Sequence, residues 1–323
     1  MEQKGFSGLV AGTKISSVLE QAKQIARYNR PVLIRGERGT GKELMARFIH
    51  QQSQRSDNSF IPVNCAAFSK ELLASELYGH EAGAFTGAQN QRRGRLEQAH
   101  EGTLFLDEIG NMPMDFQESI LRVIEYQSFE RLGTSESIHV DVRIVTATNA
   151  NLEEMIQNNQ FKADLFDRIS FAQITMPPLR QRRDEIPQLL MFVVKQLQLE
   201  MPGLEMKQFS KGCVEALIDY HWPGNIRQFK NTIERLYLSS TPELITEEHL
   251  PHEILGQSSN QPYSSESFAD QVEKFQKNLI LTYLRRNNWN QRATAKALDM
   301  SIDSFRHYYK KYKFSKDKDR EKS

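Results

Sequence analysis

Eight consecutive residues near the start of the chain have the composition of a phosphate-binding loop. They lie between an apolar run, Val32–Ile34, and a segment with helical patterning, Lys42–Ser53. Glycines let backbone N–H groups turn toward phosphate oxygens, and the N-terminus of the following helix adds partial positive charge. The residues predicted to bind a nucleoside triphosphate are Gly36, Glu37, Arg38, Gly39, Thr40, Gly41, Lys42 and Glu43. Lys42 would reach the β- and γ-phosphates, whereas Glu43 stands where Ser or Thr usually supplies a hydroxyl to Mg²⁺.

Two adjacent carboxylates follow a second apolar run, Thr103–Leu106, which reads as a strand like the run Val32–Ile34. Asp107 would bind Mg²⁺ directly or through water, and Glu108 would orient and polarise the attacking water. The alternative is an acidic turn at the end of a strand. The phosphate-binding loop upstream favours hydrolysis, because the two features together supply both halves of a nucleoside triphosphatase.

Three further polar residues stand where they would reach the same site. Asn64 follows the run Phe60–Val63, and would hydrogen-bond Glu108 if the two strands are neighbours. Asn149 follows the run Arg143–Ala147 and would sense the γ-phosphate. Arg227 lies near the start of a later helix and would reach back to the nucleotide. The alternatives are a turn residue for each asparagine and a surface cation for the arginine.

These residues need elements to position them, and the pattern of the chain predicts an α/β fold. Apolar runs alternate with helical segments as far as Met176, which indicates a parallel sheet with helices on both faces. Helical segments then follow, at Ile186–Glu200, Lys211–Tyr220 and Ile226–Ser239. We predict an α/β subdomain over residues 5–174, a helical lid over 175–252, a linker over 253–267, a helical domain over 268–314 and a basic disordered tail over 315–323.

The C-terminal segment has the pattern of a helix-turn-helix unit. Asn290–Leu298 reads as a short helix whose three alanines, at 293, 295 and 297, would permit a close helix crossing. A second helix follows, N-capped by Ser301. It would enter the major groove of DNA with Asp303, Ser304, Arg306 and His307 as contact residues. An ordinary helical hairpin remains the alternative.

Composition excludes several classes of protein. The 323 residues include 42 basic and 41 acidic side chains, so the overall charge does not indicate a partner. Only two cysteines occur, so no disulfide framework or zinc site is predicted, and a reducing cytoplasm is the expected location. The apolar runs are too short to span a membrane, and the N-terminus lacks the apolar core of a signal peptide.

A glycine-rich segment carries one large apolar residue. Its residues are Gly83, Ala84, Phe85, Thr86, Gly87 and Ala88. Small residues predict a mobile loop, and an exposed aromatic ring at its tip would dock a partner. A tight turn with Phe85 packed into the core is the alternative.

Taken together, these strings resemble the AAA+ ATPases and, within them, the bacterial enhancer-binding proteins that activate sigma-54 RNA polymerase. The hexapeptide Gly83–Ala88 is similar to the family's signature, as are Gly36–Glu43, Asn64–Ala67, Gly102–Glu108 and Trp222–Arg227. The resemblance implies ATP and Mg²⁺ as cofactors, a hexameric ring, and contact between the 83–88 loop and sigma-54. It also implies a supporting loop near Glu130–Gly133, and it accounts for Glu43, which is common in this family.

The resemblance also assigns two basic residues to the nucleotide of a neighbouring subunit. The family's segment usually reads Phe-Arg-x-Asp-Leu-x-x-Arg, and here residues 161–168 match it except that Lys162 replaces the first arginine. Arg168 matches the second. Lysine keeps the positive charge but lacks the planar fork of arginine. We therefore expect both residues to stabilise charge on the γ-phosphate, with slower turnover.

Residues 275–312 resemble the Fis-type domain that binds upstream enhancer DNA in the same family. The ATPase region begins close to Met1, where the family usually has a regulatory domain, so we expect control by a separate negative regulatory protein. Two alternatives remain open. One is an AAA+ protein similar to replication initiators, and the other is a DNA-binding switch that binds ATP without useful hydrolysis.

Overall fold

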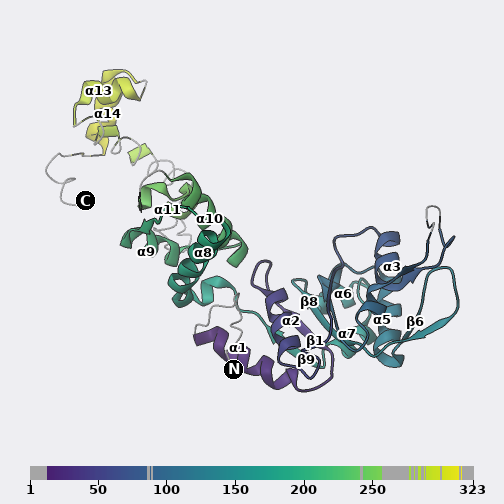
Figure 1. Ribbon diagram of the computed structural model, residues 1–323. Helices are drawn as coiled ribbons and strands as arrows, with labels where there is room; N and C mark the ends of the chain where they lie inside the picture. Colours follow the sequence, from purple (N-terminus) through teal and green to yellow (C-terminus); the bar gives the residue numbers. More distant parts are fainter. Residues whose placement is uncertain are drawn as a thin grey trace. The chain divides into compact units, whose positions relative to one another are not determined.

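The computed structural model describes residues 13–85, 88, 90–240, 243–256, 276–277, 280, 283–284, 287, 289–298, 300–312 and 314. The chain divides into two compact units, Met1–Ser258 and Ser259–Ser323. The first contains an α/β subdomain and a mainly helical subdomain, and the second contains short helices (Figure 1). Among the described residues, no helix combines the length and apolarity required to cross a bilayer.

Five parallel strands form the central sheet, in the order β2-β5-β8-β1-β9. Their bounds are β1 Val32–Arg35, β2 Phe60–Asn64, β5 Thr103–Asp107, β8 Arg143–Thr148 and β9 Ala172–Thr175. Four of them are the predicted strands, each extended by one residue at its carboxyl end. The fifth, β9, was not predicted, and among the described strands it pairs with β1 alone, at the edge of the sheet.

Helices cover both faces of the sheet, because alternate strand residues point to opposite sides. Ile34 and Phe105 pack with α1 (Thr13–Ala26) and α2 (Lys42–Gln51). Leu33 and Leu104 belong to the core on the other face. That face is covered by α3 Lys70–Tyr78, α4 Arg95–Gln98, α5 Met114–Tyr126, α6 Leu152–Gln157 and α7 Ala163–Ile169. The predicted α/β sandwich is therefore confirmed.

The carboxyl ends of the strands bring the predicted polar residues to one edge of the sheet. Asn64 is the register partner of Asp107 across β2 and β5. Arg35 and Thr148 are partners across β1 and β8, so the phosphate-binding loop and Asn149 start from the same edge. Ligands of open α/β sheets bind at this edge. After Glu108 a 3-10 turn, η1 (Ile109–Asn111), leads into α5.

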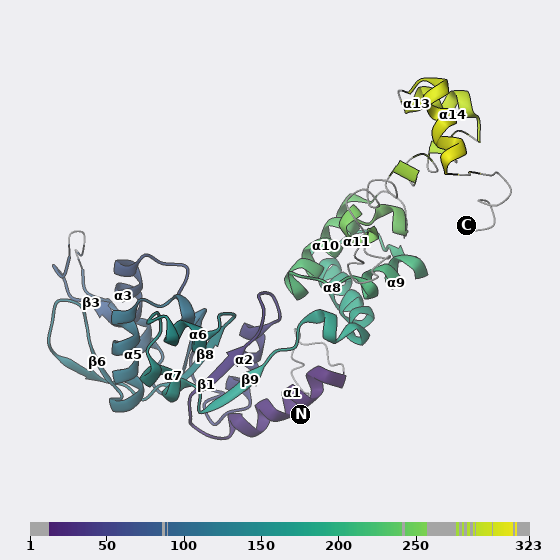
Figure 2. The same ribbon diagram turned by 180° about the vertical axis from the view of Figure 1, so that it is seen from behind.

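Two small antiparallel hairpins extend from the α/β subdomain and were not predicted. β3 (Gly79–His80) pairs with β4 (Arg92–Arg93), and β6 (Ser128–Glu130) pairs with β7 (Ser137–His139). Both lie at the end of the subdomain away from α1 (Figure 2). The first pair of strands flanks the glycine-rich segment, and the second flanks the predicted supporting loop.

The lid subdomain packs around three large aromatic side chains, Trp222, Phe229 and Tyr237. Its elements are η2 Leu179–Gln181, η3 Arg183–Glu185, α8 Ile186–Glu200, β10 Gln208–Phe209, α9 Lys211–Asp219, α10 Asn225–Ser239, β11 Leu244–Ile245, η4 Glu247–His249 and α11 His252–Leu255. The predicted linker 253–267 is wrong at its start, because Ile254 of α11 is buried in the lid core. Residues 257–267 lie outside the described residues.

The second unit contains α13 (Gln291–Ala297) and α14 (Ile302–Lys311), both predicted. Between 268 and 286, the residues that the structure describes are helical, and Ile280 and Leu284 share a hydrophobic cluster with Phe305. The expected alanine face is wrong: Ala295 is buried, whereas Ala293 and Ala297 are exposed. Residues two apart lie on different sides of a helix. The tail 315–323 lies outside the described residues.

Candidate functional site

The phosphate-binding loop joins the buried strand β1 to α2. Gly39 and Gly41 have φ angles of 76° and 99°, which favour glycine. Gly39 also has no room for a side chain, since an added Cβ would lie 2.4 Å from the carbonyl oxygen of Gly224 in the lid. The Lys42 ammonium is buried and donates hydrogen bonds to the carbonyl oxygens of Gly36 at 3.0 Å and Glu37 at 3.4 Å. The loop therefore carries its cation at the sheet edge.

The two predicted carboxylates face this cation. Glu108 Oε1 lies 3.6 Å from Lys42 Nζ, and Glu108 Oε2 accepts a hydrogen bond of 3.4 Å from the backbone N–H of Asn149. Glu108 has φ 53° and ψ 49°, a left-handed conformation that is uncommon outside glycine and clusters at functional sites. Burial, and next the charge of Glu108, raise the pKa of Asp107. The pair thus concentrates negative charge where a cation would be stabilised.

A cavity of about 260 Å³ lies between the loop, the carboxylates and the lid. It is lined by Arg38, Gly39, Gly41, Lys42, Glu43, Leu44, Asp107, Glu108, Ile226, Arg227, Lys230 and Asn231. The structure therefore brings Arg227 of α10 to the predicted site from the lid. Sequence reasoning missed Lys230 and Asn231, although they follow Arg227 by one helical turn and share its face.

Glu37 of the loop is held by two lid residues that the sequence analysis did not identify as functional. The Arg180 guanidinium donates two hydrogen bonds to its carboxylate, at 2.6 and 2.8 Å, and the Asn225 amide donates a third at 3.1 Å. The bond to Arg180 is the main cause that lowers the pKa of Glu37 to about 2. The Asn225 amide also donates to Arg38 O, and Ile226 N donates to Gly39 O. We call this set the lid clamp.

Asn64 lies beside the carboxylates but not in the predicted contact. Its strand neighbours β5 as expected, and it is level with Asp107. Its side-chain oxygen accepts a hydrogen bond of 2.9 Å from Ala66 N. Among the hydrogen bonds of the described residues, none joins Asn64 to Glu108, so this predicted contact is not formed. The local turn after β2 provides a nearer donor for the Asn64 carbonyl oxygen.

Lys162 and Arg168 do not line the cavity of their own chain. Lys162 is the N-cap residue of α7, and its ammonium is 2.9 Å from Glu118 Oε2 of α5. Arg168, in the last turn of α7, donates to Glu125 Oε1 of α5 at 2.8 Å. Both predicted basic residues are thus paired with carboxylates of α5, away from the nucleotide cavity.

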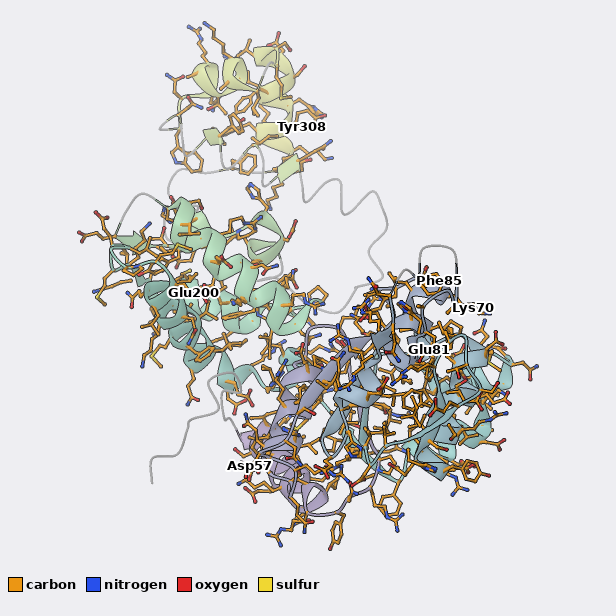
Figure 3. All side chains as sticks on the ribbon, turned by 45° about the vertical axis from the view of Figure 1, so that its right-hand side comes forward. Asp57, Lys70, Glu81, Phe85, Glu200 and Tyr308 are labelled. Atoms are coloured by element: carbon orange, nitrogen blue, oxygen red, sulfur yellow. The ribbon has the colours of Figure 1, made fainter. Side chains whose placement is uncertain are left out.

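The predicted contact loop, residues 83–88, leaves Phe85 partly exposed. Gly83 N donates to Ala88 O at 2.8 Å, and Ala88 N donates to Phe85 O at 3.0 Å. Phe85 is 46% exposed, and its ring lies edge-on to His80 with centroids 5.0 Å apart. Figure 3 shows Phe85 and Glu81 at the same end of the subdomain. Thr86 and Gly87 lie outside the described residues. The core-packed alternative for Phe85 is therefore wrong.

A second loop, which follows β6, supports the contact loop as predicted. Glu81 N donates to Leu132 O at 3.0 Å, and Leu132 N donates to Gly79 O at 3.1 Å. A side chain on Gly133 would meet Ala84 Cβ at 2.8 Å, so the two loops approach closely. Arg131 bonds the carboxylates of Glu81 and Glu97, which lowers the pKa of each. The pair of loops therefore forms one connected surface.

In the second unit, α14 exposes all four predicted DNA-contact residues. Asp303, Ser304, Arg306 and His307 are exposed, and Phe305 between them is buried. Ser301 caps the helix by accepting from Ser304 N at 3.1 Å. A helix with this one-sided exposure can enter a DNA groove.

Comparisons with protein-family models match almost the whole chain. Residues 9–175 match the sigma-54 interaction domain, residues 180–267 match the AAA+ ATPase lid domain, and residues 271–312 match the Fis family of bacterial regulatory proteins. These three matches follow one another in the order of the two subdomains and the second unit.

Individual proteins are similar over different lengths. The Psp operon transcriptional activator of Escherichia coli (strain K12) is 41% identical over 309 residues, which are 91% of this chain and 94% of that protein. The Nif-specific regulatory protein of Herbaspirillum seropedicae is 48% identical over 235 residues, 73% of this chain. This chain spans only 43% of that relative's length. The structure of NtrX from Brucella abortus in complex with ATP has a TM-score of 0.70 at 33% identity, over 94% of this chain and 68% of that one.

Proposed function

The chain belongs to the family defined by the sigma-54 interaction domain, and from this premise we propose that it is a sigma-54-dependent transcriptional activator driven by ATP hydrolysis. The observation that carries the proposal is the contact loop, whose Phe85 is presented to solvent by an ATPase fold with a supporting loop beneath it. The alternative of a replication-initiator-like ATPase does not account for this loop.

ATP would bind in the cavity between the phosphate-binding loop and the lid. The ammonium of Lys42 would exchange its bonds to backbone carbonyls for phosphate oxygens, and Arg227 would approach from α10. The lid clamp supports this assignment, since it joins Glu37, Arg38 and Gly39 of the loop to the lid. NtrX, which is similar over most of this chain, is known in complex with ATP.

The residues present fit a Mg²⁺ ion shared with the phosphates. Burial, and next the charge of Glu108, raise the pKa of Asp107, and a divalent cation would relieve the repulsion between the two carboxylates. Asp107 would hold the ion, as Mg²⁺ sites commonly use one or two carboxylates with phosphate oxygens and water. The bound ion would neutralise charge that develops on the phosphates.

We assign Glu108 to the attacking water. Its carboxylate lies at the sheet edge, within 3.6 Å of Lys42 and bonded to the backbone of Asn149. It would accept a hydrogen bond from the water and orient it in line with the leaving group. Asn149 directly follows β8 and its backbone N–H is bonded to Glu108. It would therefore respond to whether the γ-phosphate is present.

Hydrolysis would be completed between the subunits of a homo-oligomeric, hexameric ring. Lys162 and Arg168 do not line the cavity of their own subunit and are paired with carboxylates of α5, so we assign them to the nucleotide of the next subunit. There they would stabilise charge on the transferred phosphoryl group.

ATP hydrolysis would move the contact loop, which would bind sigma-54 RNA polymerase. The Fis-type unit would hold the ring at upstream enhancer DNA through α14, with Arg306 and His307 as its cationic and polar contacts. Remodelling of the closed promoter complex into the open complex would follow from movement of the paired loops.

The narrower target that we propose is the phage shock operon. The Psp operon activator matches along nearly all of its own length, whereas the Nif-specific relative is matched over less than half of its length. A separate PspA-like negative regulator would then control the chain. A reporter under a phage shock promoter, compared with one under a nitrogen-fixation promoter, separates the two assignments.

Binding to purified sigma-54 tests the proposal. We expect the full chain to form a complex with sigma-54 in the presence of a transition-state analogue of ATP, and not in the presence of ADP. A chain that hydrolyses ATP and melts origin DNA without binding sigma-54 would support the replication-initiator alternative instead.

A further inference from the structure

One buried amide side chain connects the two catalytic parts of the α/β subdomain. Gln117, in the first turns of α5, is 0% exposed. Its Nε2 donates to Met112 O at 2.8 Å and to Gln160 O at 3.3 Å, and its Oε1 accepts from Lys162 N at 2.8 Å. Both ends of the amide are therefore bonded to backbone on either side of α5.

On one side the amide reaches the turn that carries the catalytic carboxylate. Asn111 N donates to Glu108 O at 2.9 Å, and Met112 N donates to Ile109 O at 3.0 Å. This turn packs closely against the end of β8, since a side chain on Gly110 would meet Ala150 Cβ at 3.1 Å and Thr148 Oγ1 at 3.4 Å. Movement at Glu108 would therefore be passed to Met112.

On the other side of α5, the amide binds the backbone of Lys162, the basic residue that we assign to the nucleotide of the neighbouring subunit. Lys162 begins α7, and its carbonyl oxygen accepts from Phe166 N at 3.1 Å. Its ammonium bonds Glu118, the residue after Gln117. Adjacent residues of α5 thus fix the backbone and the side chain of Lys162.

These two restraints differ in character. The exposed Lys162–Glu118 pair is weak and would release readily when the lysine meets a phosphate. The buried amide bonds are more strongly restrained, because a displaced Gln117 would leave buried polar groups without partners. The backbone of Lys162 should therefore follow the turn after Glu108 while its side chain remains free to exchange partners.

We propose that Gln117 is a positioning residue that couples the catalytic turn of one subunit to the basic residue that the same subunit presents to its neighbour's nucleotide. The proposal rests on the proposed function, since it assumes that Lys162 acts across a subunit interface. It adds a route by which the nucleotide bound to one subunit would affect the rate of ATP hydrolysis at the neighbouring site.

The Gln117→Met variant of the full chain removes the three hydrogen bonds at nearly constant volume. We expect kcat for ATP to fall by about 10- to 100-fold, since a misplacement of about 1 Å can cost ~10²-fold, with KM for ATP within about twofold. A raised KM with unchanged kcat would overturn the proposal, because it would place the effect in ATP binding within the same subunit.

Mixed rings separate an effect on the neighbour from an effect on the subunit's own site. Glu108→Gln subunits should hydrolyse ATP about 10²- to 10⁴-fold more slowly than wild type but present an intact Lys162 segment. When they are added in excess, we expect the turnover per Gln117→Met subunit to rise. A second mixture uses the double variant Glu108→Gln, Lys162→Ala, which should give no rise. Equal turnover in the two mixtures would overturn the proposal.

If Gln117→Met does not fold, a second variant, Gln117→Glu, tests the same proposal. It keeps an oxygen that can accept from Lys162 N, and it lacks the amide N–H donors. We expect its kcat to lie between those of the wild type and Gln117→Met, and its mixture with Glu108→Gln to show the same rise. A wild-type chain without ATPase activity would instead refute the proposed function, so the two failures are distinguishable.

Discussion

The ammonium of Lys42 lies 3.6 Å from the carboxylate of Glu108 and 3.0 Å from the carbonyl oxygen of Gly36. The cation that would bind the phosphates and the base that would orient the water are thus already neighbours across the sheet edge. Because the γ-phosphate would enter between them, the group that binds the phosphate and the group that orients the attacking water would both contact it.

Removing the charge of Glu108 should separate binding from hydrolysis. We expect Glu108→Gln to lower ATP turnover by about 10²- to 10⁴-fold, the usual contribution of a positioned base. ATP affinity should be retained or increased, since a negative charge near the phosphates is lost. Steady-state turnover and equilibrium ATP binding measure the two effects. Glu20→Gln, at an exposed carboxylate of α1, is the control and should change neither quantity.

The lid clamp should make stability depend on pH through Glu37. Its pKa is lowered from 4.5 to about 2, chiefly by the hydrogen bonds from Arg180. A lowered pKa contributes stability that is present above 4.5 and is lost as pH falls toward 2. The carboxylate is 42% exposed, so we expect Glu37→Gln to cost roughly 1 kcal/mol or less at neutral pH.

Denaturant unfolding of wild type and Glu37→Gln, at pH about 7 and about 3.5, measures this difference. The difference in the free energy of unfolding between the two proteins should be smaller at the acidic pH. A difference that grows as pH falls would contradict the assigned ion pair. Glu153→Gln removes a comparable arginine pair, with Arg35, outside the lid clamp, and should leave KM for ATP unchanged, whereas Glu37→Gln should raise it.

Restoring arginine at position 162 should raise turnover. A guanidinium bonds a phosphate through two donors, whereas an ammonium acts as a point charge. We expect Lys162→Arg to hydrolyse ATP faster than wild type, and Lys162→Ala to fall by about 10- to 100-fold because Arg168 shares the role. ATPase rate against subunit concentration is the measurement. Arg122→Ala, which removes another cation paired with Glu118, should match wild type.

Truncating the exposed ring of the contact loop should uncouple the ATPase from its output. Phe85 touches His80 but remains 46% exposed, so its loss should not unfold the subdomain. We expect Phe85→Ala to keep ATPase activity within about twofold of wild type and to lose sigma-54-dependent transcription, since a central aromatic contact often dominates an interface. Tyr28→Ala, at an exposed ring of the same unit, should retain both activities.

The sequence predicted the elements whose signals are local. The apolar runs at Val32, Thr103 and Arg143 became strands that are buried within a parallel sheet, and the run at Phe60 became the partly exposed edge strand β2. The strand β9 was missed because two of the four residues of Ala172–Thr175 are polar, so the segment has no continuous apolar run. The helix α1 was also missed, although Ile15, Leu19 and Ala22 repeat at helical spacing.

For the site, the sequence predicted the residues at strand ends but not the contacts from the lid. The position of Asp107 and Glu108 follows from the end of one strand. The bond between Arg180 and Glu37 depends on how two distant segments pack, and no local pattern encodes it. The Asn64–Glu108 contact was wrong for a similar reason, because the turn after β2 offers Asn64 a closer partner.

Promoter opening tests the central claim most directly. Full-length protein, sigma-54 RNA polymerase and a sigma-54 promoter with its upstream site would be incubated with ATP or with a non-hydrolysable analogue, and single-stranded thymines at the start site would be measured by permanganate reactivity. We expect reactivity with ATP alone, and none with the analogue or with Glu108→Gln. Equal reactivity with ATP and the analogue, or no reactivity with ATP from a chain that hydrolyses it, would contradict an ATP-driven sigma-54 activator.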